Sequence, residues 1–307
     1  MSKMSEERVN ISNLGTETRN PKTMNLDLLT TGEIIRIMNE EDHHVIEAVK
    51  EALPQIEKAV ELVIKALNEG GRLIYAGAGT SGRIGIMDAV ECVPTFSTTD
   101  EVMAIIAGGN GAFVKAVEGA EDSTELAKTD LRNLNLTEKD VVCAIAASGR
   151  TPYCIGALVY AREAGAGTVS ICCNKQAKLS KYADIPIEVD AGPEILTGST
   201  RLKSGTCQKL ICNMISTASM VGIGKVYGNL MVDMKATNLK LVERAKRIVM
   251  QSTQCDYEIA ERILEETDYS TKEAIVMILA GVDRETAVEL LNHNKGFIRK
   301  CIDPLHK

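Results

Sequence analysis

The sequence lacks the features that would assign it to several large classes of protein. Its formal net charge is −7 and it has no block of Lys and Arg, which argues against a nucleic-acid surface. No apolar run reaches the length that spans a bilayer. The first residues, MSKMSEERVN, contain no apolar signal core. We therefore expect a cytoplasmic protein with neither a nucleic acid nor a membrane as partner.

Histidine is scarce and lies only toward the two ends, at His43, His44, His293 and His306. A site in the central region must therefore transfer protons through carboxylates, Lys or Tyr, and a metal site built from His is excluded there. The nine Cys show no metal-type spacing, so we expect small, buried and reduced side chains. The sequence gives no reason to expect a metal or a redox cofactor.

What the sequence does contain is an alternation of apolar strands and helices. Strands that are apolar throughout and separated by helices are typical of a parallel sheet that is covered on both faces. Such a sheet binds ligands at the carboxyl ends of its strands. The strands are expected at residues 73–76, 102–107, 141–146, 168–172 and 185–189.

Helical segments surround this alternating region. We expect domain boundaries at 1–50 for an N-terminal arm with helices, 51–222 for the α/β domain and 223–307 for a C-terminal helical bundle. Residues 1–25 are polar and predict an ordered but irregular arm. Pro54 should interrupt the second of the two helices that follow. The expected helices are 31–39, 42–69, 81–90, 112–118, 123–134, 152–164, 199–221, 228–252, 256–266, 271–280, 284–292 and 297–302.

Two similar turns connect an apolar strand to a helix, and each contains the triplet Ser-Gly-Arg. Thr80 and Ser81 open one helix, and Ser148 and Thr151 open another. Hydroxyl groups, free amides and the positive end of a helix together suit a phosphate dianion. Plain N-capping is the alternative, but two equivalent turns on one sheet favour a phosphate site.

The sequence around these two turns does not match two well-known nucleotide-binding motifs. No Gly-Lys-Ser/Thr follows the glycines, so this is not a Walker loop. GAGTSG also lacks the acidic residue that a dinucleotide site requires at the end of the next strand. Arg83 and Arg150 are candidates for a bidentate phosphate clamp, with solvated helix surface as the alternative. Glu194 and Ser199, in GPEILTGST, are further candidates for substrate binding.

Two carboxylates are placed to act as a catalytic acid and base. Glu91, in DAVECVPTF, lies near the C-terminal end of a helix, where a carboxyl tends to keep its proton. Glu121, in VEGAEDSTE, precedes a helix whose expected capping box is Asp122 with Glu125, and the positive helix end favours its ionised form. Opposite shifts of this kind suit acid and base partners. Glu118 and Asp122 are the rivals for the base.

A continuous helix would separate Ser81 from Glu91 by ~15 Å, which exceeds the span of a hexose phosphate. Glu91 therefore either bends back after an early helix end or serves the site of a neighbouring subunit. We favour the second, because the long apolar helices offer a dimerisation face. A homodimer with its site near the interface is expected.

At these residues the chain closely resembles the N-acetylmuramic acid 6-phosphate etherase family, which is related to the sugar isomerase (SIS) domains. The resemblance covers about 15–240 and implies a doubly wound parallel sheet that binds a phosphosugar. The stretches that carry it include TETRNPKTMNLDLLT, LIYAGAGTSGRIG, DAVECVPTF, AVEGAED, DVVCAIAASGRTPY, GPEILTGSTRLKSGTCQKL, GKVYGNLMVDM and TNLKL.

The resemblance implies cleavage of the lactyl ether at C3 of N-acetylmuramic acid 6-phosphate, by elimination and then hydration. Carried over by motif, Glu91 matches the proton donor and Glu121 the second catalytic glutamate, here interpreted as the base. Ser81, Ser148 and Thr151 match phosphate-contacting positions of the wider SIS fold. The implied setting is the recycling or catabolism of cell-wall amino sugars.

Two other functions fit the same fold. An aldose–ketose isomerase also abstracts the C2 proton, and Glu194 would then be the candidate base. A phosphosugar-binding regulator, as in the related glucokinase regulatory protein, would need no catalytic pair. The chain departs from the family pattern ECPPTFG at Val93 and Ser97, and Cys207 stands where Ala is common. Loss of one proline could loosen the turn behind Glu91.

Overall fold

The computed structural model describes residues 14–302, apart from 116, 235 and 237. These residues form two compact units. The first unit contains residues 14–59, 74–86 and 104–212, and the second contains 60–73, 87–103 and 213–302. Residues 1–13 of the expected N-terminal arm lie outside the described residues. No helix in the described part of the chain is long and apolar enough to cross a membrane.

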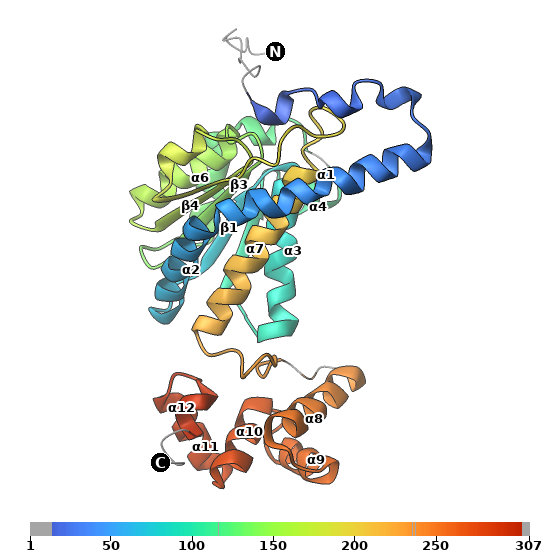
Figure 1. Cartoon of the computed structure of the whole chain (residues 1–307). Coiled ribbons are helices and arrows are strands. Elements are labelled where there is room, and N and C mark those ends of the chain that lie inside the picture. Colours follow the sequence, from blue (N-terminus) through green and yellow to red (C-terminus); the bar gives the residue numbers. More distant parts are fainter. Residues whose placement is uncertain (1–13, 116, 235, 237, 303–307) are drawn as a thin grey trace. The chain divides into compact units, whose positions relative to one another are not determined.

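A five-stranded sheet flanked by helices forms the α/β part of the chain (Figure 1), and its strand order is β2-β1-β3-β4-β5. Strands β3 to β5 pair in parallel, with Val141 opposite Gly167 and Val169 opposite Ile185. This order reverses direction between β1 and β3, which is the point where doubly wound sheets bind their ligands. The strands are β1 (Leu73–Gly77), β2 (Val102–Ile106), β3 (Val141–Ala146), β4 (Gly167–Cys172) and β5 (Ile185–Glu188).

The expected strands are confirmed to within one residue at each end, because their sequences leave little alternative. Every residue of β1 and of β3 is buried. A strand that is covered on both faces must be apolar throughout rather than alternating, and LIYAG and VVCAIA meet that condition. The apolar runs therefore predict both the position of each strand and its central place in the sheet.

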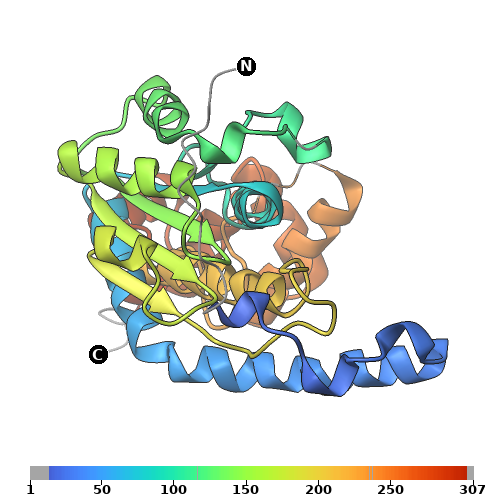
Figure 2. The same ribbon diagram turned by 90° about the horizontal axis from the view of Figure 1, so that it is seen from above.

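Helices cover both faces of the sheet. Helix α6 (Pro152–Glu163) packs against β3 and β4, and α5 (Thr124–Asn133) packs on α6. Figure 2 shows these two helices on one side of the sheet and α1 (Thr31–Glu51) on the other. The α5–α6 contact is close, because a Cβ added at Gly156 would lie 2.3 Å from the Thr124 carbonyl oxygen. Helix α4 (Gly111–Val114) is a single turn.

Several helix boundaries differ from the sequence-based expectation. Helix α1 runs without a break through residues 39–42, and the interruption lies at Ala52, before α2 (Leu53–Asn68). The break matches Pro54, which lacks the amide proton that a helix interior requires. Helix α3 (Gly79–Phe96) is longer than expected, and α7 (Lys203–Gly222) begins four residues later than expected.

The C-terminal part of the second unit is a bundle of short helices around an apolar core. Its helices are α8 (Leu239–Thr253), α9 (Tyr257–Glu266), α10 (Thr271–Ala280), α11 (Arg284–His293) and α12 (Ile298–Ile302). The expected helix start at residue 228 is wrong. Helix α8 begins only after Asn238, whose side-chain oxygen accepts a hydrogen bond from the Leu241 amide.

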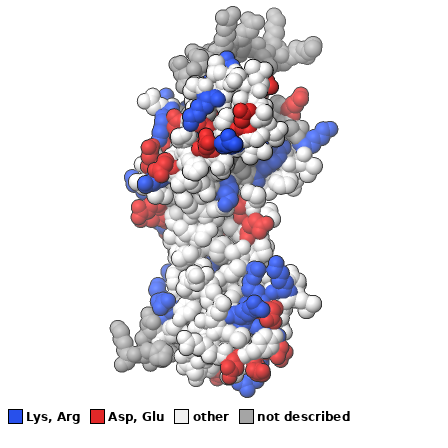
Figure 3. Space-filling model, turned by 45° about the vertical axis from the view of Figure 1, so that its right-hand side comes forward, with Lys and Arg blue, Asp and Glu red and all other residues white. Residues whose placement is uncertain are grey.

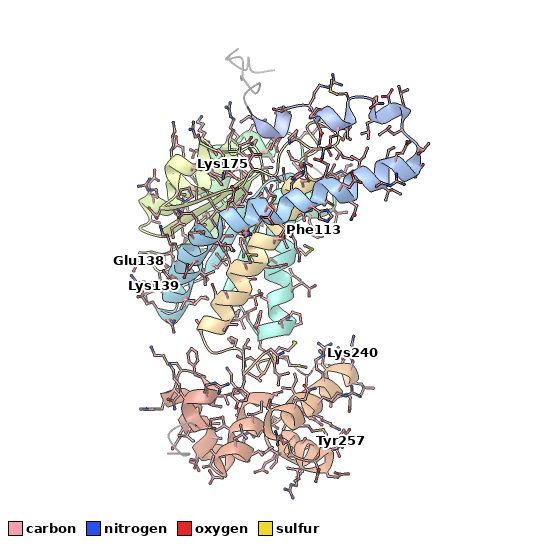
Figure 4. All side chains as sticks on the ribbon, viewed as in Figure 1. Phe113, Glu138, Lys139, Lys175, Lys240 and Tyr257 are labelled. Carbon is pink, nitrogen blue, oxygen red and sulfur yellow. The ribbon has the colours of Figure 1, made fainter. Side chains whose placement is uncertain are left out.

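Charged side chains of both signs are interspersed on the face of the molecule that Figure 3 shows. Within the bundle, Lys246 pairs with Glu261 and donates to the Tyr257 hydroxyl at 2.9 Å. Figure 4 labels Tyr257 on this bundle. Both hydrogen bonds favour the ammonium form and raise the pKa of Lys246 above its ordinary value.

Candidate functional site

A cavity of about 440 Å³ lies at the carboxyl ends of β1 and β3, where the strand order reverses. It collects both Ser-Gly-Arg turns and the segment that contains Glu121. All four residues predicted to bind phosphate line it. The lining residues are Leu14, Glu17, Ala78, Gly79, Thr80, Ser81, Glu121, Asp122, Ile145, Ala146, Ala147, Ser148, Arg150, Thr151, Pro152, Gly198 and Thr200.

The first turn brings Thr80 and Ser81 to the start of α3, which begins at Gly79. The chain turns here with little space, because a Cβ on Gly77 would lie 2.7 Å from the Gly82 amide nitrogen. Ser81 is buried, and its hydroxyl donates a 3.0 Å hydrogen bond to Oε1 of Gln208. The first amides of an α-helix have no carbonyl partner within the helix, so the N-terminal end of α3 suits a bound anion.

The second turn leaves the Thr151 hydroxyl available for a ligand. Thr151 is the N-cap residue of α6, yet its side chain makes no capping hydrogen bond, and Pro152 occupies the first helical position. Plain N-capping, the alternative reading of this threonine, is therefore not what its hydroxyl does. Ser148 Oγ accepts a hydrogen bond from the Arg150 amide at 3.3 Å.

The backbone conformation of the second turn requires glycine at position 149, between Ser148 and Arg150. Its φ of +66° is left-handed, and an added Cβ would lie 2.5 Å from the Cβ of Ala177. The same Cβ would lie 3.2 Å from the sulfur of Cys172. Burial raises the pKa of the Cys172 thiol to about 12, so this cysteine is a small apolar side chain beneath the turn rather than a nucleophile.

Glu121 lies on a 3₁₀ turn, Ala120–Asp122, just before α5. The expected capping box of Asp122 with Glu125 is wrong: the N-cap of α5 is Ser123, whose hydroxyl accepts from the Leu126 amide at 3.1 Å. A serine hydroxyl is as good a cap as an aspartate, and here it stands one residue closer to the helix. Asp122 is left exposed at the edge of the cavity.

Glu121 is also the carboxylate shared by two adjacent cavities. A second cavity of about 180 Å³ shares Ala78, Gly79 and Glu121 with the first. Its rival Glu118 lines only the smaller cavity, and Asp122 lines only the larger one. We call these the main cavity and the side cavity. Glu121 therefore stands where a ligand could extend from one cavity into the other.

The N-terminal arm forms part of the wall of the main cavity, which the sequence did not predict. Leu14 and Glu17 line it, and a Cβ on Gly198 would lie 3.6 Å from Oε2 of Glu17. A buried pair holds the arm in place, since Asn174 Nδ2 donates to the Thr16 hydroxyl at 3.1 Å. The polar residues in TETRN predicted an ordered arm, but they did not predict which part of the fold the arm would contact.

Three of the remaining candidate residues, Glu194, Ser199 and Arg83, do not line the main cavity. Glu194 is 1% exposed, and its two oxygens accept hydrogen bonds from the amides of Lys203 and Ser204, each at 2.9 Å. It caps α7 and is not placed to act as a base. Ser199 precedes α7 rather than opening it and does not line the main cavity, although its neighbours Gly198 and Thr200 do. Arg83 lines the side cavity, whereas Arg150 lines the main one.

Glu91 belongs to the second unit, and it is exposed on α3. The helix does not end early: it continues past Pro94 to Phe96. Pro94 cannot donate an amide proton, but the Thr95 hydroxyl donates to the Glu91 carbonyl at 2.8 Å and supports the last turn. Of the two explanations considered for the Ser81–Glu91 spacing, an early helix end is therefore wrong.

Where the arm meets α1 and the start of α7, four side chains form what we call the Glu41 cluster: the buried Asn20, Glu41 and Lys203, and the exposed Lys22. Lys203 Nζ donates to Glu41 Oε2 at 2.8 Å, and both side chains are at most 5% exposed. Lys22 and Asn20 each donate to the same carboxylate at 2.9 Å. Lys203 is therefore a buried ion-pair partner of Glu41 rather than a solvated charge on the helix surface.

The electrostatics of this cluster are dominated by its hydrogen bonds. Burial alone would raise the pKa of the Glu41 carboxyl, but the donors Lys203, Lys22 and Asn20 outweigh it and lower the pKa from 4.5 to about 2. The cluster thus fixes a charged carboxylate between the arm, α1 and the start of α7.

No group of three or more His, Cys, Asp and Glu within the described ranges could hold a metal ion.

Two family models match the sequence, and both describe SIS domains. The model "Glucokinase regulatory protein N-terminal SIS domain" matches residues 55–162, and the model "SIS domain" matches residues 120–218. Among solved structures, the phosphoheptose isomerase from Neisseria gonorrhoeae has a TM-score of 0.45 and 18% identity, covering 60% of this chain and 98% of that chain. The enzyme of the same name from Francisella tularensis has a TM-score of 0.47 and 18% identity, covering 62% of this chain and 100% of that chain.

Much higher similarity is found to proteins that share the whole length of the chain. The N-acetylmuramic acid 6-phosphate etherase of Bacillus cereus (strain G9842) is 58% identical over 293 residues, which are 95% of this chain and 100% of the relative. The N-acetylmuramic acid 6-phosphate etherase 2 of Lactiplantibacillus plantarum is 58% identical over 296 residues, which are 96% and 100%. At this identity and coverage, the chain belongs to the N-acetylmuramic acid 6-phosphate etherase family.

Proposed function

We propose that this protein is a carbon–oxygen lyase that cleaves the lactyl ether of N-acetylmuramic acid 6-phosphate. The products are N-acetylglucosamine 6-phosphate and D-lactate. One observation carries this proposal beyond the family relationship. The four predicted phosphate-binding residues and Glu121 line a single cavity at the reversal point of the sheet. One ligand could therefore bind its phosphate to these four residues and have a proton removed by the Glu121 carboxylate.

The phosphate group would be held at the ends of α3 and α6. Thr80 and Ser81 supply hydroxyls and amides from the first turn of α3, and Thr151 supplies a hydroxyl that caps nothing. The positive ends of both helices favour a dianion at this point. Arg150 lines the same cavity and adds positive charge.

The chemistry then follows from the position of Glu121 at the boundary of the two cavities. In the open-chain sugar the C1 aldehyde acidifies the C2 proton, and Glu121 accepts that proton as general base. The C2–H and C3–O bonds break, a C2=C3 double bond forms, and the leaving oxygen takes a proton from Glu91. Water then adds across the double bond, returning a proton to C2 and placing a hydroxyl on C3.

We infer that Glu91 serves the cavity of a partner subunit in a homodimer. The second half of α3 exposes an apolar face, with Met87, Val90 and Val93 between 40% and 59% exposed. Glu91 lies beside Val90 on this helix and is exposed with it. An apolar helix face of this kind is typical of an interaction surface, and a second copy would cover it. The nine free cysteines support a reducing compartment, so we infer a cytoplasmic enzyme.

The direct test is incubation of the protein with N-acetylmuramic acid 6-phosphate, followed by an assay of D-lactate. The wild-type protein should release D-lactate, and addition of a chelator should not change the rate. Glu121→Gln and Glu91→Gln should each lower kcat by about 100-fold or more, because each removes one proton-transfer group. Both variants should still bind N-acetylglucosamine 6-phosphate. Full turnover by both variants would refute the assigned roles.

The shared site can be tested by mixing two inactive variants. Glu91→Gln and Ser148→Ala damage the acid and the phosphate seat respectively. If Glu91 acts in trans, a mixed dimer contains one site with both defects and one site with neither. Activity should return to roughly a quarter of the wild-type value when equal amounts of the two variants reassociate at random. No recovery, under conditions where labelled subunits are seen to exchange, would show that each site is built from one chain.

A further inference from the structure

We propose that the side cavity is the binding subsite for the lactyl group and that Arg83 binds its carboxylate. This inference rests on the proposed function and extends it to a part of the substrate that no residue has yet been assigned to hold. The substrate carries two anions, a phosphate on C6 and a carboxylate on the C3 substituent. The two lie at different positions along the sugar, so two separate seats are needed.

The position of the side cavity fits the C3 substituent. It adjoins the main cavity through Ala78, Gly79 and Glu121. The base that takes the C2 proton must lie within hydrogen-bond reach of C2, and C3 is the next carbon. A group on C3 of a sugar in the main cavity, with C2 beside Glu121, can therefore extend into the side cavity. Its volume of about 180 Å³ holds roughly six waters at the liquid value, which is ample for a lactyl group.

Arg83 has the charge and the remaining donors to bind a carboxylate there. Its Nε donates to the Phe113 carbonyl at 2.7 Å and its Nη2 donates to the Ala112 carbonyl at 2.8 Å. Figure 4 labels Phe113, in the single turn of α4. Among the described residues Arg83 has no further hydrogen bond and no ion pair, so the two protons on Nη1 and its full charge remain available.

The two carbonyl contacts also fix the guanidinium plane, which is a requirement for recognition of a carboxylate. A planar fork that is already oriented loses little freedom when it binds. Arg83 was expected to clamp the phosphate. It lines only the side cavity, away from Ser148 and Thr151, and this favours the second anion of the substrate as its ligand.

The remaining wall of the side cavity matches the methyl group of lactate. Ala107, Ala112 and Val117 line it with apolar side chains. Val117 and Ala112 lie close to Gly108, where an added Cβ would meet Val117 Cβ at 2.7 Å and Ala112 Cβ at 3.3 Å. The strand end, α4 and the loop before Glu121 thus form a small apolar wall with one cation, which suits a short 2-oxy acid.

The negative charges nearby do not oppose this assignment. Glu118 also lines the side cavity, but its side chain is exposed to solvent, where its field is screened. Glu121 takes up the C2 proton in the elimination step and is neutral when lactate leaves. Arg83 is therefore the main charge that the departing carboxylate meets.

The first test compares two substrates in wild-type protein, Arg83→Met and Arg83→Lys. One substrate carries the lactyl ether and the other a 3-O-isopropyl ether, in which a methyl group replaces the carboxylate. Arg83→Met should lower kcat/KM for the lactyl ether by about 10- to 100-fold, as expected for a lost charge-assisted hydrogen bond. The rate for the isopropyl ether should change less than about threefold, and Arg83→Lys should recover part of the loss. Equal losses on both ethers would mean that Arg83 only holds α4, and would overturn the proposal.

The second test measures binding, so that failure of the subsite and failure of the proposed reaction can be told apart. In a Glu121→Gln background, calorimetry gives the affinities for N-acetylmuramic acid 6-phosphate and N-acetylglucosamine 6-phosphate. We expect preference for the muramic compound, and loss of that preference with Arg83→Met. Arg150→Met is the matched control, and it should weaken both ligands equally. If the preference depends on Arg83 but the wild-type protein releases no D-lactate, the subsite stands and the proposed reaction is refuted. If the Glu121→Gln protein shows no preference, the subsite is refuted.

Discussion

At the scale of single residues, the clearest addition to the sequence-based site is Gln208 on α7. It is fully buried, its Oε1 accepts from the Ser81 hydroxyl, and its Nε2 has no partner among the described residues. In this orientation the proton of Ser81 is turned away from a ligand. If the amide turns over, Nε2 donates to Ser81 and the hydroxyl is free to donate to phosphate. We therefore expect Gln208 to position Ser81.

This expectation distinguishes two substitutions of Gln208. Gln208→Leu removes the support of Ser81 and should raise KM about tenfold with little change in kcat, which corresponds to one net hydrogen bond. Gln208→Glu should raise KM further, because a carboxylate holds the Ser81 proton and repels the phosphate. Steady-state kinetics check both effects. Lys209→Ala, at the exposed next position, is the control and should leave KM unchanged. A Gln208→Glu variant that binds as well as the wild type would contradict this role.

At the scale of secondary structure elements, Ser97 ends α3 in an unusual conformation. Its φ is +52°, in the left-handed region, immediately after the last helical residue, Phe96. Glycine is typical of this position, and the family pattern ECPPTFG has glycine where this chain has Ser97. The Ser97 hydroxyl donates to the carbonyl of Asp233, whose carboxylate pairs with Lys225 and Lys272. A hydrogen bond therefore offsets the strain of a side chain in a glycine position.

The two contributions can be separated by replacing Ser97. Ser97→Ala loses the hydrogen bond and keeps the strain, so it should lower the free energy of unfolding by about 1 kcal/mol. Ser97→Gly loses the same bond but relieves about 1 kcal/mol of left-handed strain, so it should be close to the wild type. Urea unfolding of the three proteins measures the difference. If alanine proves as stable as glycine, the backbone at this position is not strained.

At the scale of the whole molecule, the sequence predicted the sheet better than its surroundings. The runs LIYAG and VVCAIA are short, apolar throughout and followed by turns, which favours fully buried parallel strands, and the two turns after such strands lie at one edge of the sheet. The helix expected from residue 228 is wrong, because residues 228–234 form turns around an isolated bridge between Tyr227 and Leu230, and α8 begins only after the cap at Asn238. Glu17, Glu41 and Gln208 could not be predicted, because each depends on a partner more than 100 residues away.

The Glu41 cluster shows what such distant contacts do for the molecule. Glu41 lies on α1, Lys203 begins α7, and Asn20 and Lys22 belong to the N-terminal arm. One buried carboxylate therefore connects the arm that lines the main cavity to the helix that carries Gln208. The lowered pKa of Glu41, about 2, means that the folded state favours its charged form.

The stability of the protein should accordingly depend on pH through Glu41. A carboxyl with a lowered folded-state pKa stabilises the fold above its unfolded value of 4.5, and this contribution is lost as pH falls toward 2. A shift of this size corresponds to about 3 kcal/mol. Glu41→Gln should therefore be less stable than the wild type at pH 7 and should lose less stability between pH 4.5 and pH 2. Unfolding midpoints measured across this range test the slope.

Two further variants show whether the effect belongs to the buried pair. Glu40→Gln removes an exposed carboxylate from the neighbouring position of α1, and its pH dependence should follow that of the wild type. The double variant Glu41→Gln/Lys203→Met should be more stable at pH 7 than Glu41→Gln alone, because the single change leaves the Lys203 ammonium buried without its partner. If Glu41→Gln and the wild type lose stability in parallel as the pH falls, the arm and α7 are held together by packing, and the charge of Glu41 contributes nothing to that connection.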